Sequence, residues 1–227
     1  MLLDFSFEVT DMKSLFSIDS PFGQKLTLLS NLVLLNLLWI ICSVPIITMG
    51  AATSAMYHVI FLYITNQDDA VFKPFFKAFA SSLKQVTPIW ILHFLVGFMM
   101  VAEIFYLQQD ESAGLKLLFA VIVLFFLAVG GYLYPLMGRY DTTGKQALWN
   151  SLTLTLRHPG TSFLLSAVPA AIGLVMLRYP ALAWKTAIFW TLIGFSLVSY
   201  LMGRILFRVF SKYDQTASSE TMDVKQD

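Results

Sequence analysis

The chain has 227 residues, of which 57% are hydrophobic and only 13% are charged, and its formal net charge is +1. A water-soluble domain carries about 25% charged residues, so this composition excludes an ordinary soluble protein. The length fits one domain. The near-neutral charge excludes a broad nucleic-acid interface, which needs a basic face. The single cysteine, Cys42, excludes an intrachain disulfide and a cysteine-based zinc site.

Residues 1–25 precede the first long apolar run, and we expect them to form a cytoplasmic N-terminal segment. The chain starts with MLLDFSFEVTDMK, which contains three acidic residues and one lysine. A cleavable signal peptide starts with basic residues. We therefore expect none here.

Two uncharged stretches follow, residues 26–44 and 46–66, separated by Pro45. A helix rises about 1.5 Å per residue, so about 20 residues cross a hydrocarbon core of about 30 Å. The pattern predicts a hairpin of two membrane spans. Pro45 predicts the turn, and Gly50 allows close approach of the next helix. A broken helix that forms a transport site is the alternative, but this break lies near the outer surface.

Residues 71–85 form a predicted amphipathic helix between the second and third spans. At 100° per residue, four aromatic rings fall on one arc and three lysines cluster beside it: Phe72, Phe75, Phe76 and Phe79, with Lys73, Lys77 and Lys84. Such a helix suits the inner membrane surface, with its rings buried and its lysines toward phosphates. Anionic lipid alone explains the lysines, and docking of a cytoplasmic partner such as an ATPase is the other interpretation.

Four further apolar stretches complete six predicted spans, at residues 88–108, 115–137, 161–177 and 186–207. The fifth is the shortest and contains Pro169, which should kink it. Residues 145–157 form a second predicted amphipathic helix on the cytoplasmic side, with Leu148, Trp149, Leu152 and Leu156 on one stripe. The fold class expected is an all-α membrane helix bundle, with one membrane domain at 26–212 and a disordered polar tail at 213–227.

The lysines and arginines set the expected orientation. With both termini in the cytoplasm, twelve of the 15 Lys and Arg residues lie on the inner side. The outer side then holds only Lys116, Arg178 and Lys185. The six-span arrangement in the plasma membrane satisfies the positive-inside rule better than one in which the second apolar run only touches the surface.

Three segments carry a resemblance to a known family: NLLWIICSVPIITMGAATSAMYHV, VFKPFFKAFASSLKQ and GYLYPLMGRYDTTGKQALWNSL. The chain resembles the YesL family of bacterial membrane proteins, which has no assigned biochemistry. The matching positions are Asn36, Trp39, Cys42, Pro45, Thr48, Gly50, Ala51, Phe76, Phe79, Lys84, Tyr134, Pro135, Leu136 and Arg139. The resemblance implies an association with carbohydrate-uptake systems and a sugar ABC-transporter permease as partner. It supplies no catalytic residue.

Four polar residues inside the spans are candidate binding residues: Asn36, His58, His93 and Glu103. Asn36 favours a hydrogen bond that fixes helix packing, with substrate contact as the alternative. The two histidines, expected near mid-span, either bond neighbouring helices or act as a proton relay or ligand contact. Glu103 is either functional, because charge in hydrocarbon is costly, or hydrated near the outer end of its span.

Arg139 stands at a cytoplasmic span end, as do Arg204 and Arg208. Long side chains at such positions reach back to the headgroups. We therefore expect Arg139 to anchor its helix at the membrane surface.

Sequence signatures of enzymes, including GxxxxGK[ST], HExxH and GxSxG, are absent, so we expect no catalytic residue, metal or cofactor. The favoured function is that of an accessory protein of carbohydrate uptake that binds lipid and a permease. One alternative is a small solute transporter whose path is lined by the four polar residues. A membrane-embedded enzyme is the third. Convergence of the four residues on one cavity would favour transport, and the sequence leaves the oligomeric state open.

Overall fold

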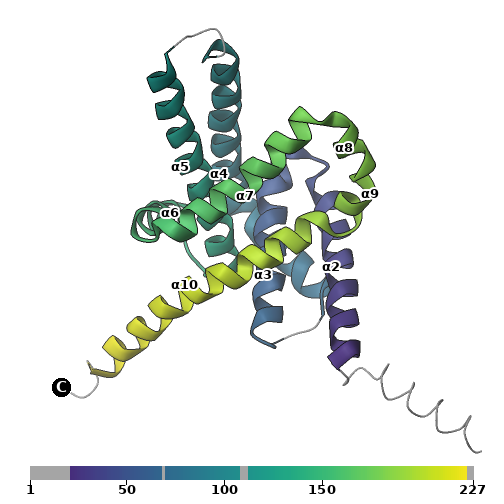
Figure 1. Ribbon diagram of the computed structural model, residues 1–227. Helices are drawn as coiled ribbons and strands as arrows, with labels where there is room; N and C mark the ends of the chain where they lie inside the picture. The colour runs from purple at the N-terminus through teal and green to yellow at the C-terminus, as the bar shows by residue number, and fades with distance from the viewer. Residues whose placement is uncertain (1–20, 68–69, 108–111, 224–227) are drawn as a thin grey trace, which may run out of the picture.

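The computed structural model describes residues 21–67, 70–107 and 112–223, and within these ranges it is helical with no strand. The all-α expectation is confirmed. The elements, labelled as in Figure 1, are α2 (Pro21–Ser43), η1 (Ile46–Thr48), α3 (Met49–Ile64), α4 (Phe72–Leu107), α5 (Ala113–Arg139), α6 (Gly144–Arg157), α7 (Pro159–Arg178), α8 (Pro180–Lys185), α9 (Ala187–Phe189), η2 (Trp190–Gly194) and α10 (Phe195–Asp223).

Six helical stretches are long and apolar enough to cross a membrane, and they correspond to the six predicted spans. They cover Phe22–Ser43, Ile46–Ile64, Phe72–Glu103, Ala113–Arg139, Pro159–Arg178 and Ala187–Gln215. The fifth is a full 20 residues long despite Pro169 in its interior. A proline removes one helical hydrogen bond, and membrane helices accommodate that loss when neighbours compensate.

Two boundaries differ from the sequence-based expectation. The surface helix at 71–85 and the third span are one helix, α4, with Pro88 in its interior. We expected a disordered tail from residue 213, but residues 213–223 are helical, because α10 continues to Asp223. Residues 213–223 contain neither glycine nor proline, so nothing local stops a helix that is already nucleated. Residues 1–20 and 224–227 lie outside the described residues.

The turn after the first span is held by side chains from both sides. Pro45 precedes η1, and the Thr48 hydroxyl donates to the carbonyl oxygens of Cys42 at 2.6 Å and Pro45 at 2.8 Å. The Trp90 indole of α4 donates to the Ile46 carbonyl oxygen at 2.6 Å. Gly50 lies beneath Trp90, where a Cβ would come within 2.5 Å of the Trp90 Cβ. A larger residue than glycine would separate α3 from α4.

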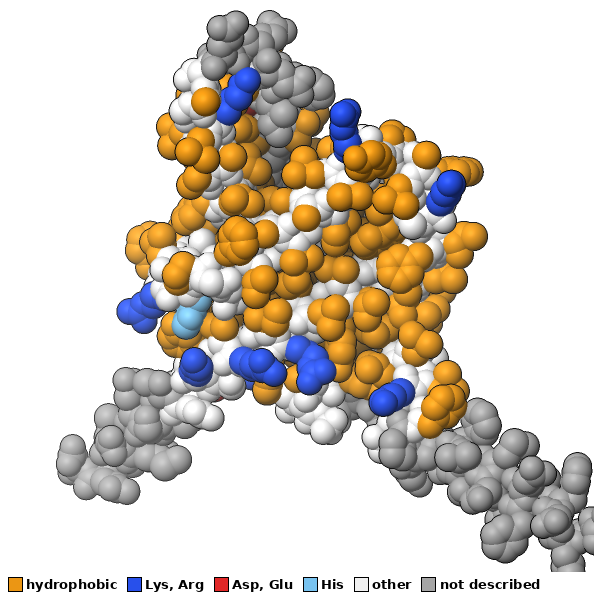
Figure 2. Space-filling view, in the orientation of Figure 1, with side chains coloured by type: hydrophobic (Ala, Val, Ile, Leu, Met, Phe, Trp, Pro, Cys, Tyr) orange, Lys and Arg blue, Asp and Glu red, His pale blue; other side chains and the backbone are white. Residues whose placement is uncertain are grey.

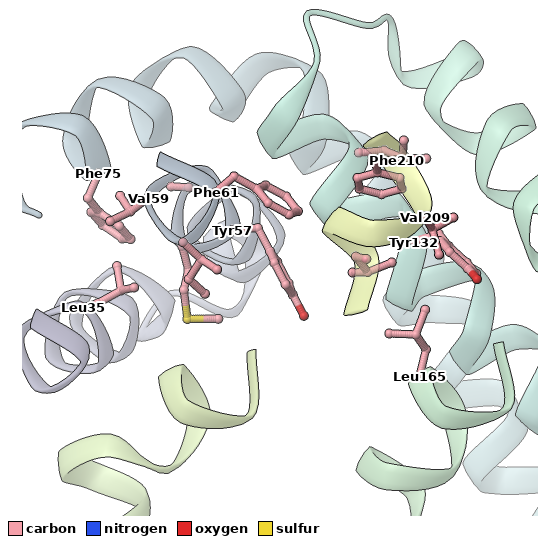
Figure 3. Packing of buried hydrophobic residues seen from close by; sticks show 14 of the residues in the cluster. Leu35, Tyr57, Val59, Phe61, Phe75, Tyr132, Leu165, Val209 and Phe210 are labelled. Atoms are coloured by element: carbon pink, nitrogen blue, oxygen red, sulfur yellow. The ribbon is translucent and has the colours of Figure 1, made fainter. Parts of the chain in front are cut away.

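α3 is the central helix of the bundle. Of its most apolar window 56% is buried by the protein itself, compared with 6% for α4. Figure 3 shows the core around it, in which Tyr57 and Phe61 of α3 lie among side chains from α2, α4, α5, α7 and α10. Two glycines permit this close packing. A Cβ on Gly138 of α5 would overlap the Ser54 carbonyl oxygen, and one on Gly203 of α10 would lie 2.7 Å from Ile60 Cγ2.

The outer surface is a hydrophobic band between two basic edges. Figure 2 shows Lys and Arg side chains along the lower edge of this face and again near its top and right, with hydrophobic side chains between. The start of α2 and the C-terminal part of α10 lie at the lower end (Figure 1). The hairpin of α4 and α5 rises away from the other helices at the opposite end. Apolar surface between two charged rims is the pattern of a membrane-spanning bundle.

Candidate functional site

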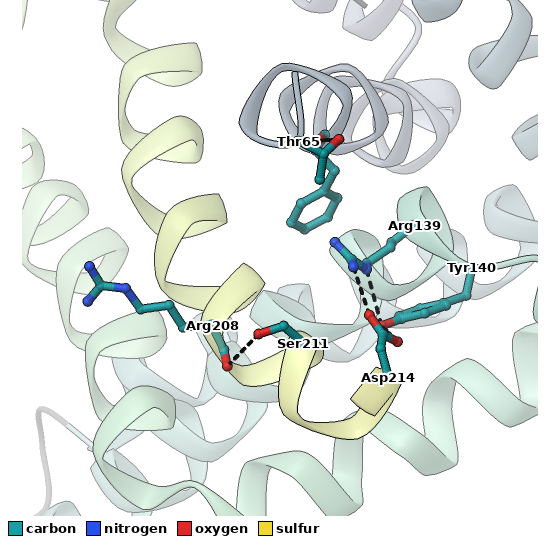
Figure 4. A network of polar contacts seen from close by, with 7 residues as sticks. Thr65, Arg139, Tyr140, Arg208, Ser211 and Asp214 are labelled. Atoms are coloured by element: carbon teal, nitrogen blue, oxygen red, sulfur yellow. Dashed lines mark hydrogen bonds and ion pairs between the residues drawn. The ribbon is translucent and has the colours of Figure 1, made fainter. Parts of the chain in front are cut away.

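A polar network joins the end of α5 to α10 at the lower end of the bundle (Figure 4). Arg139 Nη2 donates to Asp214 Oδ2 at 2.8 Å, and the Tyr140 hydroxyl donates to Asp214 Oδ1 at 2.8 Å. Arg139 Nε donates in turn to the Tyr140 oxygen at 3.1 Å. Each member of the triad contacts the other two. Both oxygens of the Asp214 carboxylate, which is still partly exposed, therefore have charged or polar donors.

Aromatic rings surround the Arg139 guanidinium. It lies 4.8 Å from the Phe207 ring centre and 5.4 Å from that of Phe61. A cation over an aromatic face is stabilised by about 0.5–2 kcal/mol, more when desolvated. The Arg139 side chain is 17% exposed. The expectation that Arg139 reaches to the headgroups as an anchor is therefore wrong: its charge is used inside the protein, to fix α10 against α5 and α3.

Two recesses that contain polar side chains flank Tyr140. The first, of about 310 Å³, is lined by His58, Thr65, Gln67, Arg139 and Tyr140. The second, of about 420 Å³, also includes Asp214 and extends along α6 and α10, where Asn150, Thr153 and Arg157 contribute. Both volumes fall in the lower part of the range of small-molecule sites. Their hydroxyl, amide and guanidinium groups can hold a small polar ligand by hydrogen bonds, so this end of the bundle is the candidate functional site.

Two titratable groups of this site have shifted pKa values. Burial raises the pKa of Tyr140 to about 12, and the hydrogen bond to Asp214 acts in the same direction. Burial also lowers the pKa of His158, and the charges of Lys212 and Arg157 lower it further. His158 Nε2 lies 2.9 Å from the Tyr213 hydroxyl of α10. Both shifts favour the neutral form at physiological pH.

Asn36 binds the backbone of the last span. Its Nδ2 donates to the carbonyl oxygens of Trp190 at 3.0 Å and Thr191 at 2.7 Å, and its Oδ1 accepts from the Ser196 backbone N–H at 2.9 Å. Residues 190–194 form the π-helical segment η2, whose wider turn changes the ladder of backbone bonds. Fully buried Asn36 satisfies both sides of that interruption. This geometry matches the packing interpretation of Asn36.

His58 lies near the middle of α3 and contacts the end of α5. Its Nδ1 is 2.8 Å from the Gly138 carbonyl oxygen. Because a carbonyl oxygen only accepts, His58 carries a proton on Nδ1 in this contact. The close approach of α5 at Gly138 makes the contact possible, and it places His58 in the same recess as Arg139.

His93 lies in an aromatic cluster between α4 and α5. Its ring stacks on Phe126 with 4.0 Å between ring centres, and Trp90 and Tyr134 lie 6.5 and 5.9 Å away. Gly130 leaves room for the imidazole, since a Cβ there would lie 2.9 Å from His93 Cε1. The histidine therefore acts as one more ring in the packing of the hairpin.

Glu103 is exposed near the end of α4, on the hairpin that rises from the bundle. It lines none of the recesses that contain the other candidates. The four intramembrane candidates are thus held apart. Asn36 bonds η2, His58 contacts the end of α5, His93 packs within the hairpin, and Glu103 faces the surroundings.

The predicted docking face at the start of α4 is divided between surface and core. Lys73, Lys77 and Lys84 are exposed, as are Phe72 and Phe76, and Phe79 is half-buried. Phe75 is fully buried and packs beside Leu35 and Val59 (Figure 3). Helical phase placed Phe75 on the same arc as the other rings, so we expected it on an exposed docking face. That assignment is wrong, because the Phe75 ring is in the core and holds α4 against α2 and α3.

Sequence reasoning missed several members of the site. Asp214 and Tyr213 were missed because both fell in the expected disordered tail, and Tyr140 because it follows the end of the fourth span. The available signal was a stripe on α10 at helical spacing, Leu206, Phe210 and Asp214. Among the described residues no group of three or more His, Cys, Asp or Glu side chains could hold a metal ion.

Six long apolar helices and a hydrophobic band between basic rims define a multi-pass helical membrane protein. A family described as "Protein of unknown function, DUF624" matches residues 32–104. The "Uncharacterized protein YesL" of Bacillus subtilis (strain 168) is 24% identical over 213 residues, which cover 92% of this chain and 99% of the relative. The chain is thus similar to this relative over most of its length, in line with the resemblance that its sequence motifs carry. No solved structure matches the chain.

Proposed function

We propose that this protein is an accessory component of carbohydrate uptake in the bacterial plasma membrane, where it binds the permease of a sugar ABC transporter. Both termini lie in the cytoplasm, because the positive-inside rule places the lower, base-rich end there. The protein catalyses no reaction and moves no solute by itself. The family resemblance motivates the choice of partner.

The separation of the four intramembrane polar residues supports the proposal that the protein moves no solute by itself. A sugar path needs several polar groups that converge near the midplane. Here Asn36 makes three bonds to backbone groups of the last span, and His58 contacts the Gly138 carbonyl oxygen of α5. His93 is enclosed by rings. Polar groups that are already satisfied by the protein offer no continuous set of contacts to a passing hydroxyl-rich solute.

The α4–α5 hairpin supports the binding half. It stands away from the other helices (Figure 1), and the protein itself buries little of its apolar surface. Leu92, Leu95 and Met99 are exposed at helical spacing on α4. A helix pair that stands apart from the other helices can pack against the spans of a partner without disturbing the bundle.

A photocrosslinking scan tests the binding half. A benzophenone amino acid at Leu95 or Met99 should capture a tagged sugar permease in intact membranes. The same probe at Ile41 of α2, or at Val44 just after it, is the control, because both side chains are comparably exposed. There the probe should capture mainly lipid. Equal permease capture from α2 and the hairpin would argue against a hairpin interface, and no capture from any site would refute permease binding.

Reconstitution tests the transport alternative. The purified protein alone in liposomes should give no counterflow of the sugar whose uptake depends on it. Deletion of its gene should lower both that uptake and the amount of assembled permease. Counterflow that Asn36→Ala or Glu103→Gln abolishes would replace the accessory function by transport.

A further inference from the structure

An apolar groove separates α5 from α7 at the end opposite the polar network. It has a volume of about 680 Å³, and its walls include Phe119, Val123 and Leu127 of α5 and Gly173 and Leu177 of α7. The groove closes where Gly131 of α5 meets Leu165 of α7, because a Cβ on Gly131 would lie 3.0 Å from the Leu165 Cβ. From that contact the two helices diverge toward the tip of the hairpin (Figure 1).

The groove has the length of one leaflet. Its lining on α5 extends from Lys116 to Leu127, about 16 Å at 1.5 Å per residue. Half of a hydrocarbon core is about 15 Å. A partner helix that crosses the bilayer would have to leave the groove halfway, at the Gly131–Leu165 contact, whereas a single acyl chain ends there.

The open end of the groove is basic. Lys116 is the charged residue among those that line it, and Arg178 follows Leu177 at the end of α7. Both side chains are exposed, and neither has an ion-pair partner within the described residues. Glu103 is exposed on α4 but does not line the groove. An apolar groove as long as one leaflet, with cations at its open end, complements a lipid with an anionic headgroup.

Gly173 lies on the α7 wall of the groove. A Cβ at this position would meet nothing within 4 Å, so packing inside the chain does not require glycine here, in contrast to Gly50 or Gly138. Its neighbours Leu174 and Leu177 are 67% and 80% exposed, which leaves this part of α7 for an external occupant to cover.

We propose that the α5–α7 groove is a binding site for an anionic phospholipid, with one acyl chain between α5 and α7 and the headgroup phosphate at Lys116 and Arg178. The lipid fills the wedge that the diverging helices leave and braces the hairpin against the bundle. This inference does not depend on the permease proposal.

Native mass spectrometry of the full chain in detergent tests the site. The protein is incubated with phosphatidylglycerol or with phosphatidylcholine of the same acyl chains, and retained lipid is counted. The wild type should retain phosphatidylglycerol in preference to phosphatidylcholine. Lys116→Gln should lower phosphatidylglycerol retention about fivefold, which corresponds to about 1 kcal/mol for one cation at the surface. Lys185→Gln, also basic and exposed at this end but outside the groove, should change nothing.

Two variants test the groove itself. Gly173→Phe and Ala120→Phe, from opposite walls, should reduce retention of both lipids. Gly160→Phe is the matched control, because a Cβ on Gly160 also meets nothing but lies outside the groove. Equal retention of the two lipids by the wild type, or retention that neither groove variant lowers, would overturn the proposal. Loss of a protein complex in Gly173→Phe without loss of lipid would do so too, in favour of a second protein as occupant.

Discussion

Asn36 was recognisable in the sequence as a polar residue that needs a partner, and an interhelical bond was one of two interpretations. The partners themselves lie 154 to 160 positions away in the chain. Two of them are backbone groups freed by a π-helical turn that the hydropathy of residues 186–207 does not reveal. A single sequence therefore indicates that a buried amide is satisfied, but the identity of its partner depends on how distant helices are placed.

Replacement of Asn36 by leucine should destabilise the protein by about 1–3 kcal/mol, because it leaves the Ser196 N–H and two carbonyl oxygens without partners in a dry interior. The side chains are similar in size, so the effect reports hydrogen bonding more than packing. Unfolding in mixed micelles by a denaturing detergent gives the measurement. Asn150→Ala, at an exposed position, is the control, and equal stability of the two variants would contradict the structural role of Asn36.

The surroundings of Arg139 and His58 also depend on contacts between distant helices. Position near a span end predicted headgroup contact for the arginine, and a place inside a span predicted a mid-membrane role for the histidine. The structure brings the two to one recess, because Gly138 lets α5 approach α3 and because α10 extends far enough to present Asp214. Neither condition is visible in the local sequence around Arg139 or His58.

At the scale of the element, α4 and α6 show what helical phase can and cannot predict. Phase identified the residues that share an arc of α4, but not which neighbour covers each of them. α6 buries the face of Ala147, Ser151 and Thr155, while Trp149 is 70% exposed. The small residues on this face permit close contact with neighbouring helices. The apolar stripe that contains Trp149 therefore faces away from the protein.

Spin labels at the start of α4 should distinguish its two faces. If this segment lies against the inner leaflet, labels that replace Phe72 and Phe76, both exposed, should be accessible to oxygen and poorly accessible to an aqueous nickel reagent. A label at exposed Ser81 should show the reverse. A label at Phe75 should be shielded from both reagents, because that position is in the core. Aqueous access at Phe72 and Phe76 equal to that at Ser81 would rule out membrane contact.

For the whole molecule, hydropathy predicted the number of long apolar helices correctly, whereas the third begins at Phe72 and the last extends to Gln215. The reason is physical: a bilayer imposes a length of about 20 residues and a nearly charge-free composition on each span. Both properties can be read from the local sequence without knowing what the span packs against. The arrangement of the spans cannot be read in this way. The central place of α3 follows from small residues such as Ala51 and Gly138 that only the assembled bundle explains, and the projection of the hairpin has no local signature.

The orientation remains a prediction from the charge distribution, and thiol labelling of cells tests it. In a Cys42→Ser background, cysteines at Ser112 and Ala181 should react with an impermeant reagent added from outside. Cysteines at Ser81 and Lys145 should react only after the membrane is permeabilised. All four positions are exposed, so protein burial does not confound the result. Outside labelling at Ser81 or Lys145 would invert the proposed orientation or break the six-span order.

The π-helical turn at Trp190–Gly194 sets the phase of the last span. One residue is worth about 100° of rotation along a helix, so the wider turn lets the two parts of the rod face different neighbours. At the start of the turn, the Trp190 carbonyl oxygen accepts from Asn36. After the turn, Leu206 and Phe210 enter the core and Asp214 reaches Arg139. Removal of one residue here would regularise the helix and turn the Asp214 side away from its partner. The last span should accordingly accept many changes of composition but few changes of length.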